Sequence, residues 1–476
     1  MPLPGGKDVA VKFANWIIGI CLFTASFDVF LNINLGGNLR FTQFVMVLFL
    51  LIAMAKVLQE GRFLWPRGAG ALALWLGCLI LFLPQSGNWL IGLQMLGLLL
   101  FSVAGMLAIL QVYGLSSQIE TLMKLYMASF VFIALAGMLQ FALPLFGLHS
   151  FFVGQWIIHG RLARINGFMI EPSYYATYLI IGWILLVELR ISKARIATGR
   201  LWGWATVLVT VVLILCTSKS GWLVMAVEVL ARLAPLTWRG MRNALRQASA
   251  GRMTIPLPGR VAIGKWVLGF VLLAAISIPA MLWLSGHVSA TVFLNGSGLA
   301  STPAHSVYLR LRDTKRTWRI FTDHPYIGLG LGGVPVANAA YYGIHVTDMD
   351  VARHWWGFPV LLDMLTASGI FAFIPFLIFL YANTIGAYRR ASLSMPEERA
   401  KWLRALARAM IFEWLMLLID QNILRVYLWY HFAMVTTVAY NLEFAPASVT
   451  APLLDRIPLL SRRFTLLPID PGDLAR

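Results

Sequence analysis

Charged residues are scarce in this sequence, and acidic residues are the scarcest of them. Only 12% of the 476 residues are charged, with 20 Asp and Glu against 38 Lys and Arg, while 59% are hydrophobic. A soluble domain cannot bury that much apolar surface, so the composition predicts a multi-spanning membrane protein. The net charge of +18 would indicate nucleic-acid binding in a soluble chain. In a membrane protein it first reflects the sidedness of the loops, and we expect no nucleic-acid partner.

Cysteine is nearly absent, and motifs for metals and nucleotides are missing. Cys21, Cys78 and Cys216 lie far apart in or beside apolar segments, so they predict neither a disulfide framework nor a metal site. No cluster of His, Cys, Asp and Glu has metal-ligand spacing, and no nucleotide-binding fingerprint occurs. We therefore expect no metal and no cofactor, and any chemistry would use a preactivated lipid substrate.

Long apolar segments fill most of the chain. They predict an all-α integral membrane protein with about twelve transmembrane helices, forming one polytopic domain over residues 1–476. A polar break at residues 217–220 predicts two short helices rather than one long helix. The predicted segments are 11–31, 41–58, 71–84, 88–112, 122–146, 169–189, 201–217, 219–234, 265–286, 357–381, 405–420 and 424–442.

The distribution of Lys and Arg predicts the orientation of these segments. With the N-terminus inside, every strongly basic short connection falls on the cytoplasmic side, and so does the C-terminal tail. This leaves a medium outer loop at residues 147–168 and a large outer loop at residues 287–356, between helices 9 and 10. The large loop is itself basic, which the rule permits because long loops translocate largely regardless of charge.

One candidate site lies where the medium loop enters the segment at 169–189. Pro172 suits the first turn of a helix, and Glu171 suits the position before it, where the helix dipole favours a negative charge. Glu171 is therefore either a helix-stabilising carboxylate or a functional one. Arg164 is harder to explain structurally, because charges at the edge of a membrane segment usually serve a site.

A second candidate site lies in the large loop, at residues 306–333. Arg312, Arg316 and Arg319 follow helical spacing and form a basic stripe, and Arg310 lies two residues before it. The stripe predicts either a surface helix on lipid headgroups or an anion site, because guanidinium groups match phosphate oxygens in bidentate geometry. The glycines at 328, 330, 332 and 333 allow tight turns, which would bring backbone amides close to the same ligand.

A third candidate site precedes the segment at 357–381. His354 is the candidate base, because histidine exchanges protons most readily near neutral pH. Its neighbour Arg353 is a candidate anion ligand, and the alternative proton acceptors are His345, Asp348 and Asp350.

Two weaker signals lie at other predicted turns. Lys219, in the polar break, either contacts an anion or extends to the membrane interface. Asp420 and Arg425 flank the last outer turn, and we expect them to pair with one another.

These stretches, in this order, resemble the O-antigen ligase and polymerase family of bacterial surface polysaccharide assembly. The resemblance spans about residues 160 to 380, and each motif is degenerate while their joint order is more specific. Lys219 stands where many relatives have arginine, and Trp355 follows the histidine where many have asparagine. The matching features are Arg164, Gly167, Glu171-Pro172-Ser173, Thr217-Ser218-Lys219-Ser220, Arg310, Pro325 with Gly328 and Gly330, and His354.

The resemblance implies metal-independent, inverting glycosyl transfer on the periplasmic face of the bacterial inner membrane. The substrate would be a glycan linked to undecaprenyl diphosphate, and the partners would be membrane lipids and a chain-length regulator protein. His354 or Glu171 would take the acceptor proton. The cations expected to hold the diphosphate are Arg164, Arg310, Lys219, Arg312 and Arg353.

Three functions remain open at this point. A polymerase adds repeat units into exopolysaccharide or O-antigen, and Glu-Pro-Ser in place of Asn-Pro favours it. A ligase transfers finished polymer to lipid A-core. A transporter or flippase of an anionic lipid-linked substrate would place charges near the midplane in two matching halves. This sequence instead predicts that the unusual charges gather at one face.

Overall fold

The structure, a computed structural model, describes residues 6–28, 30, 32–34, 38–249, 307–394, 397–419 and 423–445. These residues are mostly helical, and five helices are long and apolar enough to cross a membrane by length and composition. The five are Phe41–Glu60, Trp89–Tyr113, Ile119–Leu145, Pro172–Ile191 and Val360–Leu393. The predicted segment 265–286 and residues 287–306 of the large loop lie outside the described residues.

Most described helices lie close to the predicted segments, but α1 ends at Thr24 rather than 31, α8 runs to Ser249 rather than 234, and α16 begins at Glu398 rather than 405. The residues at 217 and 218 separate two helices, as predicted, and Thr217 takes a positive φ of 52° at the break. The helices are α1 (Gly6–Thr24), α2 (Phe41–Glu60), α3 (Ala69–Leu81), α4 (Trp89–Tyr113), α5 (Ile119–Leu145), α6 (Pro172–Ile191), α7 (Arg200–Leu215), α8 (Lys219–Ser249), α11 (Val307–Asp323), α12 (Gly333–Ala340), α13 (Met349–Ala352), α14 (Val360–Asn383), α15 (Ile385–Leu393), α16 (Glu398–Leu417) and α17 (Val426–Phe444), with short 3₁₀ turns η1 (Leu83–Ser86) and η2 (Arg195–Ala197).

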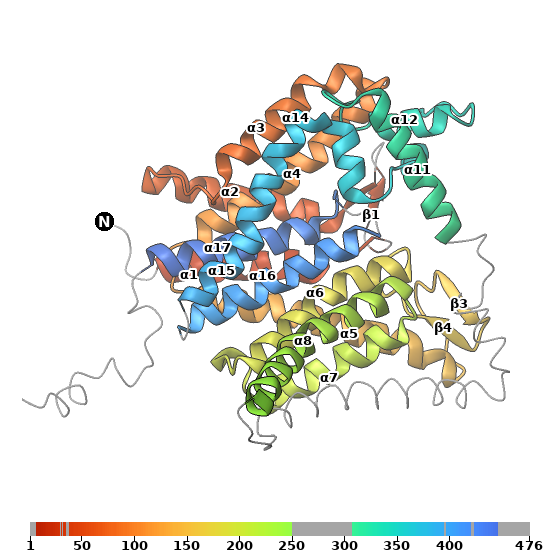
Figure 1. The fold of residues 1–476 in the computed structure, drawn as a ribbon. Helices are drawn as coiled ribbons and strands as arrows, with labels where there is room; N and C mark the ends of the chain where they lie inside the picture. The colour runs from red at the N-terminus through yellow and green to blue at the C-terminus, as the bar shows by residue number, and fades with distance from the viewer. Residues whose placement is uncertain are drawn as a thin grey trace, which may run out of the picture.

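The helix α16 lies between two groups of helices. It packs against α6, and α6 in turn packs against α5, α7 and α8. On the other side α17 packs on α4, and α14 packs on α3. Figure 1 shows the α5–α8 group on one side of α16, and α3, α4 and α14 on the other. Residues far apart in the sequence therefore meet at the two ends of these central helices.

Two short antiparallel hairpins interrupt the helical architecture. The strands β1 (Asn32–Asn34) and β2 (Asn38–Arg40) form one, and β3 (Gln155–Ile158) and β4 (Leu162–Arg164) form the other. The second hairpin occupies the loop predicted at 147–168, and buried amides attach it to the helices. Gln140 on α5 accepts bonds from the amides of Asn166 and Gly167 at 2.9 and 2.8 Å. The loop is thus fixed directly before α6 begins.

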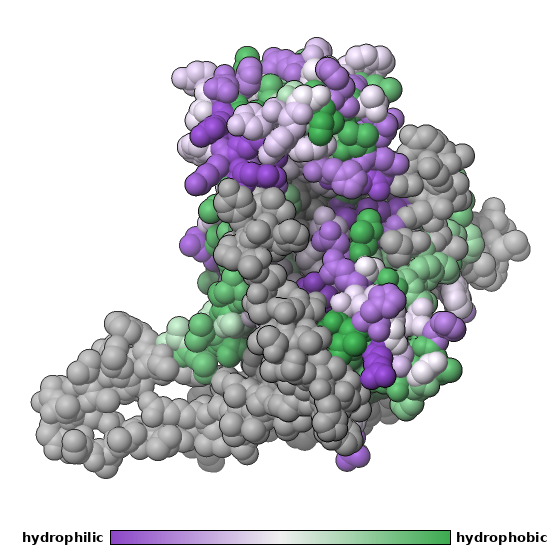
Figure 2. Space-filling view, turned by 90° about the vertical axis from the view of Figure 1, so that its right-hand side faces the viewer, coloured by the Kyte–Doolittle hydropathy of each residue, from purple (hydrophilic) through white to green (hydrophobic). Residues whose placement is uncertain are grey.

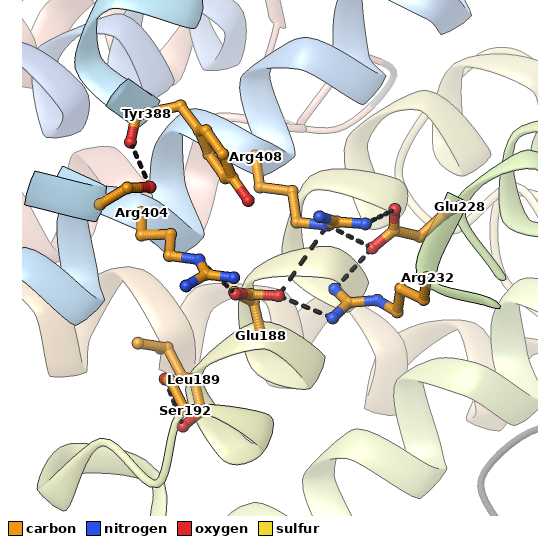
Figure 3. Close-up of polar contacts among 9 residues, drawn as sticks. Glu188, Leu189, Ser192, Glu228, Arg232, Tyr388, Arg404 and Arg408 are labelled. Carbon is orange, nitrogen blue, oxygen red and sulfur yellow. Dashed lines mark hydrogen bonds and ion pairs between the residues drawn. The ribbon is translucent and has the colours of Figure 1, made fainter. Parts of the chain in front are cut away.

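A buried ionic cluster joins α6, α8 and α16 at the other end of α6 (Figure 3). Glu228 accepts two bonds of 2.8 Å from Arg408, and Glu188 lies 2.6 Å from Arg232 and 3.1 Å from Arg404. The carboxylate side chains are 1% and 3% exposed. The predicted apolar segments did not indicate that these charges would meet.

Candidate functional site

The candidate site begins at the first turn of α6. Glu171 is the residue before the helix and Pro172 is its first residue, as predicted. The Glu171 side chain is exposed and accepts a bond of 3.1 Å from the hydroxyl of Ser173, and it does not cap the helix backbone. A negatively charged carboxylate at this position still interacts favourably with the helix dipole. It is held close to the helix end and remains open to a ligand.

Arg164 connects this turn to the break between α7 and α8. Its guanidinium donates to the Thr217 hydroxyl at 3.0 Å, to the Thr217 carbonyl at 3.1 Å and to Gln155 at 2.7 Å. Burial lowers the pKa of Arg164, while Cys216 and Glu171 act in the opposite direction. An arginine stays protonated despite such a shift. The structure therefore brings together Arg164, Glu171 and the break that begins α8 with Lys219.

A second group of charges lies beside the same turn, and we name it the arginine cluster: Asp28, Arg40 and Arg425. Asp28 accepts an ion pair from Arg40 at 3.1 Å and another from Arg425. The Arg425 guanidinium lies 4.3 Å from the ring centroid of Tyr174, in the first turn of α6. The cluster therefore packs directly against the helix that Glu171 precedes.

In the arginine cluster two guanidinium groups pair with Asp28. Burial lowers the pKa of Arg425, but Asp28, Tyr174 and Tyr427 outweigh it, so the pKa lies above its ordinary value. Burial also lowers the pKa of Arg40. The negative charge of Asp28 raises this pKa, and the positive charges of Arg425 and Arg353 lower it. Arg353 is thus close enough for its charge to act on Arg40. Cations converge here from β2, α13 and the start of α17.

The sequence patterns did not identify Arg40 and Asp28, and the described residues do not test the predicted pair between Arg425 and Asp420. Asp420, its expected partner, lies outside the described residues, and Arg425 pairs with Asp28, 397 positions away in the chain. A charged residue directly before an apolar segment was the available signal for Arg40. Nothing local indicates that Asp28 would lie between the two arginines.

The basic stripe of the large loop forms the helix α11, as its spacing predicts, but its arginines have different environments. Arg310 donates to the Ile419 carbonyl at 2.8 Å and so connects α11 to the turn after α16. Arg316 is buried and donates to Asn338 at 2.8 Å. Arg312 is partly exposed and lies 5.6 Å from the Tyr342 ring. Arg310 and Arg316 therefore serve contacts within the protein, and Arg312 is the most exposed of the three.

The glycines after α11 serve packing rather than ligand binding. The amides of Leu329 and Gly330 donate to the carbonyls of Thr366 and Ala367 at 3.0 and 2.9 Å. Those carbonyls are available because α14 is kinked at Gly369, which has φ 66° and ψ 173°. A side chain on Gly330 would meet the Phe82 carbonyl oxygen at 2.4 Å. The expectation that these amides would reach a ligand is wrong for Leu329 and Gly330, because α14 already uses them.

The candidate proton acceptors near α13 differ in their surroundings. Asp348 caps α13, and its bonds from the Val351 amide and the Thr347 hydroxyl hold its pKa below the ordinary value. Asp350 pairs with Arg353. His345 and His354 are exposed at the surface. Asp348 already accepts bonds from the amides of Asp350 and Val351 and is therefore a poor base, whereas His345, His354 and Glu171 remain candidates.

These groups share one face of the molecule. Figure 2 views the side on which Figure 1 places α11, β1, β3 and β4, and hydrophilic residues gather over its upper part at the height of α11 and α12. Among the described residues, no group of three or more His, Cys, Asp and Glu side chains could hold a metal ion. The arrangement suits the binding of an anion next to a carboxylate and a histidine.

Comparison with known proteins adds no relative. Neither a family model nor a curated protein sequence matches this chain.

Proposed function

We propose that the protein polymerises undecaprenyl-diphosphate-linked oligosaccharide repeat units into exopolysaccharide or O-antigen, by inverting glycosyl transfer at the outer face of the bacterial inner membrane. The observation that carries the proposal is the gathering of fixed guanidinium groups around the first turn of α6. Arg40 and Arg425 both pair with Asp28, and the hydrogen bonds of Arg164 within the described chain go to the neutral Thr217 and Gln155. A diphosphate leaving group needs such preorganised cations.

The cations would divide the work according to their positions. Arg164 and Arg425 flank the first turn of α6 and would hold the diphosphate of the donor. Arg40 and Arg353 would add charge on the side of β2 and α13. Lys219 begins α8 beside Thr217, the partner of Arg164, and would meet the same ligand. Because hydrogen bonds already orient most of these groups, little reorganisation is needed when charge develops on the leaving oxygen.

In addition, the arginines of α11 would serve the growing glycan. Arg310 is tethered to the turn before α17, and Arg312 lies over Tyr342 on the same face. A planar aromatic ring next to a guanidinium suits a sugar ring and its hydroxyl groups. These residues would therefore orient the substrate beyond its diphosphate.

The reaction moves one proton and one glycosyl group. The acceptor hydroxyl attacks the anomeric carbon, the bond from that carbon to the diphosphate breaks, and the hydroxyl proton passes to a base. Glu171 is the better supported base, because it precedes the turn that touches Arg425 and its charge acts on Arg164. His354, next to Arg353, is the second candidate.

The proposal includes a topology that places this site outside the cell. About twelve spans with both termini in the cytoplasm would put the first turn of α6, the arginine cluster and α11 on the periplasmic side. The polyprenyl chain would then lie among the helices, and a chain-length regulator protein would act on the same face.

The direct test measures lipid-linked glycans in the source strain after deletion of the gene. The deletion is complemented with the wild type, with Arg425→Gln or with Arg62→Gln, an exposed arginine paired with Glu60. Accumulation of single repeat units, relieved by the wild type and Arg62→Gln but not by Arg425→Gln, supports the polymerase. Membrane levels of each variant are measured in parallel, so that loss of protein is separated from loss of transfer.

Two other outcomes would replace the proposal. Accumulation of long polymer on the lipid carrier would indicate a ligase that transfers polymer to lipid A-core. An unchanged glycan pool would reject glycosyl transfer and favour a transporter or flippase of an anionic lipid-linked substrate.

A further inference from the structure

A cavity of about 440 Å³ lies at the opposite end of the helices from the candidate site. The turn between α2 and α3, the end of α14 with α15, and the last turns of α17 line it. Arg67, Arg390 and Glu443 provide its charges, and aromatic side chains, including Trp65 and Phe444, form much of the remaining wall. It thus combines a charged centre with an apolar border.

The charged centre has an excess of cations. Arg67 donates to Glu443 at 2.9 and 3.0 Å, and the Arg390 Nε atom lies 3.5 Å from the same carboxylate. Two guanidiniums therefore face one carboxylate among the described lining residues. The Arg67 side chain is 55% exposed and that of Arg390 is 24% exposed. Both can accept a second anion without breaking a buried pair.

Helix lengths place this cavity at the far membrane interface. The helix α17 runs from Arg425 in the arginine cluster to Phe444 in the cavity wall, and its 19 residues span about 28 Å. The helix α2 runs from Arg40 toward Trp65 over 20 residues, or about 30 Å. That distance matches the hydrocarbon thickness of a bilayer, about 30 Å.

The apolar border has the character of an interface belt. Trp65 is 62% exposed and Phe444 is 59% exposed, so both present rings to the surroundings. Exposed aromatic rings at the end of membrane helices lie at the level of lipid headgroups. A ligand here would meet cations at its polar end and rings along its apolar part.

We propose that this cavity binds the phosphate headgroup of an anionic phospholipid from the leaflet at that end. The phosphate lies between Arg67 and Arg390, which offer the planar donors that match its oxygens. The first part of the acyl chains contacts Trp65 and Phe444. The site is separate from the proposed glycosyl transfer and does not depend on it.

The test uses the full chain, purified in a mild detergent, and native mass spectrometry with added phosphatidylglycerol or phosphatidylcholine. The wild type retains phosphatidylglycerol in preference to phosphatidylcholine. Arg390→Gln and Arg67→Gln each lower its retention about tenfold, the value of one lost charge-assisted contact. Arg62→Gln, outside the cavity, leaves retention unchanged. Because Arg67 lies in an exposed turn, its variant tests the site even if Arg390→Gln unfolds.

Glu443→Gln supplies the sharper comparison. Removing this carboxylate frees both arginines, so phosphatidylglycerol retention rises if the cavity is an anion site. A fall in retention would overturn the proposal. Equal retention of both lipids by the wild type would also overturn it, and so would displacement of phosphatidylglycerol by millimolar inorganic phosphate, because either result removes the lipid headgroup as the ligand.

Discussion

The arginine cluster and the buried ionic cluster contain the same kinds of side chain and are similarly buried, but they lie at opposite ends of α6. In the ionic cluster three arginines face two carboxylates, each of which contacts two or three guanidiniums. In the arginine cluster Arg40 and Arg425 both pair with Asp28.

The difference separates a structural role from a binding role. The two carboxylates of the ionic cluster connect α6, α8 and α16. The arginine cluster lies against the first turn of α6, beside Glu171, where the proposed donor diphosphate would bind. The contrast therefore predicts that removing a charge from the ionic cluster mainly lowers stability, whereas removing a charge from the arginine cluster mainly lowers glycan transfer.

The largest expected effect is loss of stability in the ionic cluster. Glu228→Gln removes one of the two carboxylates that pair with both Arg232 and Arg408. Breaking a buried pair in this way costs about 3–5 kcal/mol. Denaturant unfolding of the purified protein in mixed micelles measures it. Glu60→Gln, an exposed residue paired with Lys56 and Arg62, is the control with little change. A loss under about 1 kcal/mol would show that the cluster does not hold the helices.

The next effect is loss of activity in the arginine cluster. Arg425→Gln lowers glycan transfer about 100-fold, the scale of one lost transition-state donor, about 2.7 kcal/mol. Its unfolding free energy falls less than that of Glu228→Gln. Arg425→Lys keeps the charge but not the planar fork, so it restores activity only in part. Equal losses of stability in Arg425→Gln and Glu228→Gln would remove the distinction between the two clusters.

The third prediction concerns the kink of α14 at Gly369, where a substitution is expected to lower stability although no charge is removed. A side chain on Gly369 would meet the Tyr326 carbonyl oxygen at 2.2 Å, and its φ of 66° is strained for alanine. We expect Gly369→Ala to cost about 1–3 kcal/mol. Gly77→Ala in α3, with nothing within 4 Å, is neutral or stabilising. Thermal unfolding of both variants compares them, and a neutral Gly369→Ala would mean that the kink does not require glycine.

The smallest effect concerns Asp348, which caps α13 beside Arg353. Its pKa is lowered in the folded protein, so its contribution is present above the ordinary value of 3.8 and is lost as the pH falls through the folded value. Asp348→Asn therefore speeds exchange of the Val351 amide at neutral pH but not in strong acid. Hydrogen exchange measured by mass spectrometry against pH checks this. If the wild type and Asp348→Asn still differ in the exchange rate of the Val351 amide in strong acid, the ionised carboxylate is not the group that protects this amide.

Local sequence patterns predicted much of the helical architecture. Within the described residues the predicted apolar segments are mostly helical, the break at Thr217 separates α7 from α8, and Pro172 begins α6. These features depend on hydrophobicity, turn residues and proline geometry, which act within a few residues. The roles of Arg164, Glu171 and His354 in catalysis stay predictions.

The sequence by itself determined that the chain is apolar and helical, and where most helices begin and end, because those properties are local. Only the tertiary structure decided which charges meet. Asp28 lies between Arg40 and Arg425, and Glu188 lies against Arg232, although these residues are distant in the chain. A charge that is buried away from water needs an oppositely charged or hydrogen-bonding partner. The packing of the helices determines which partner is close enough.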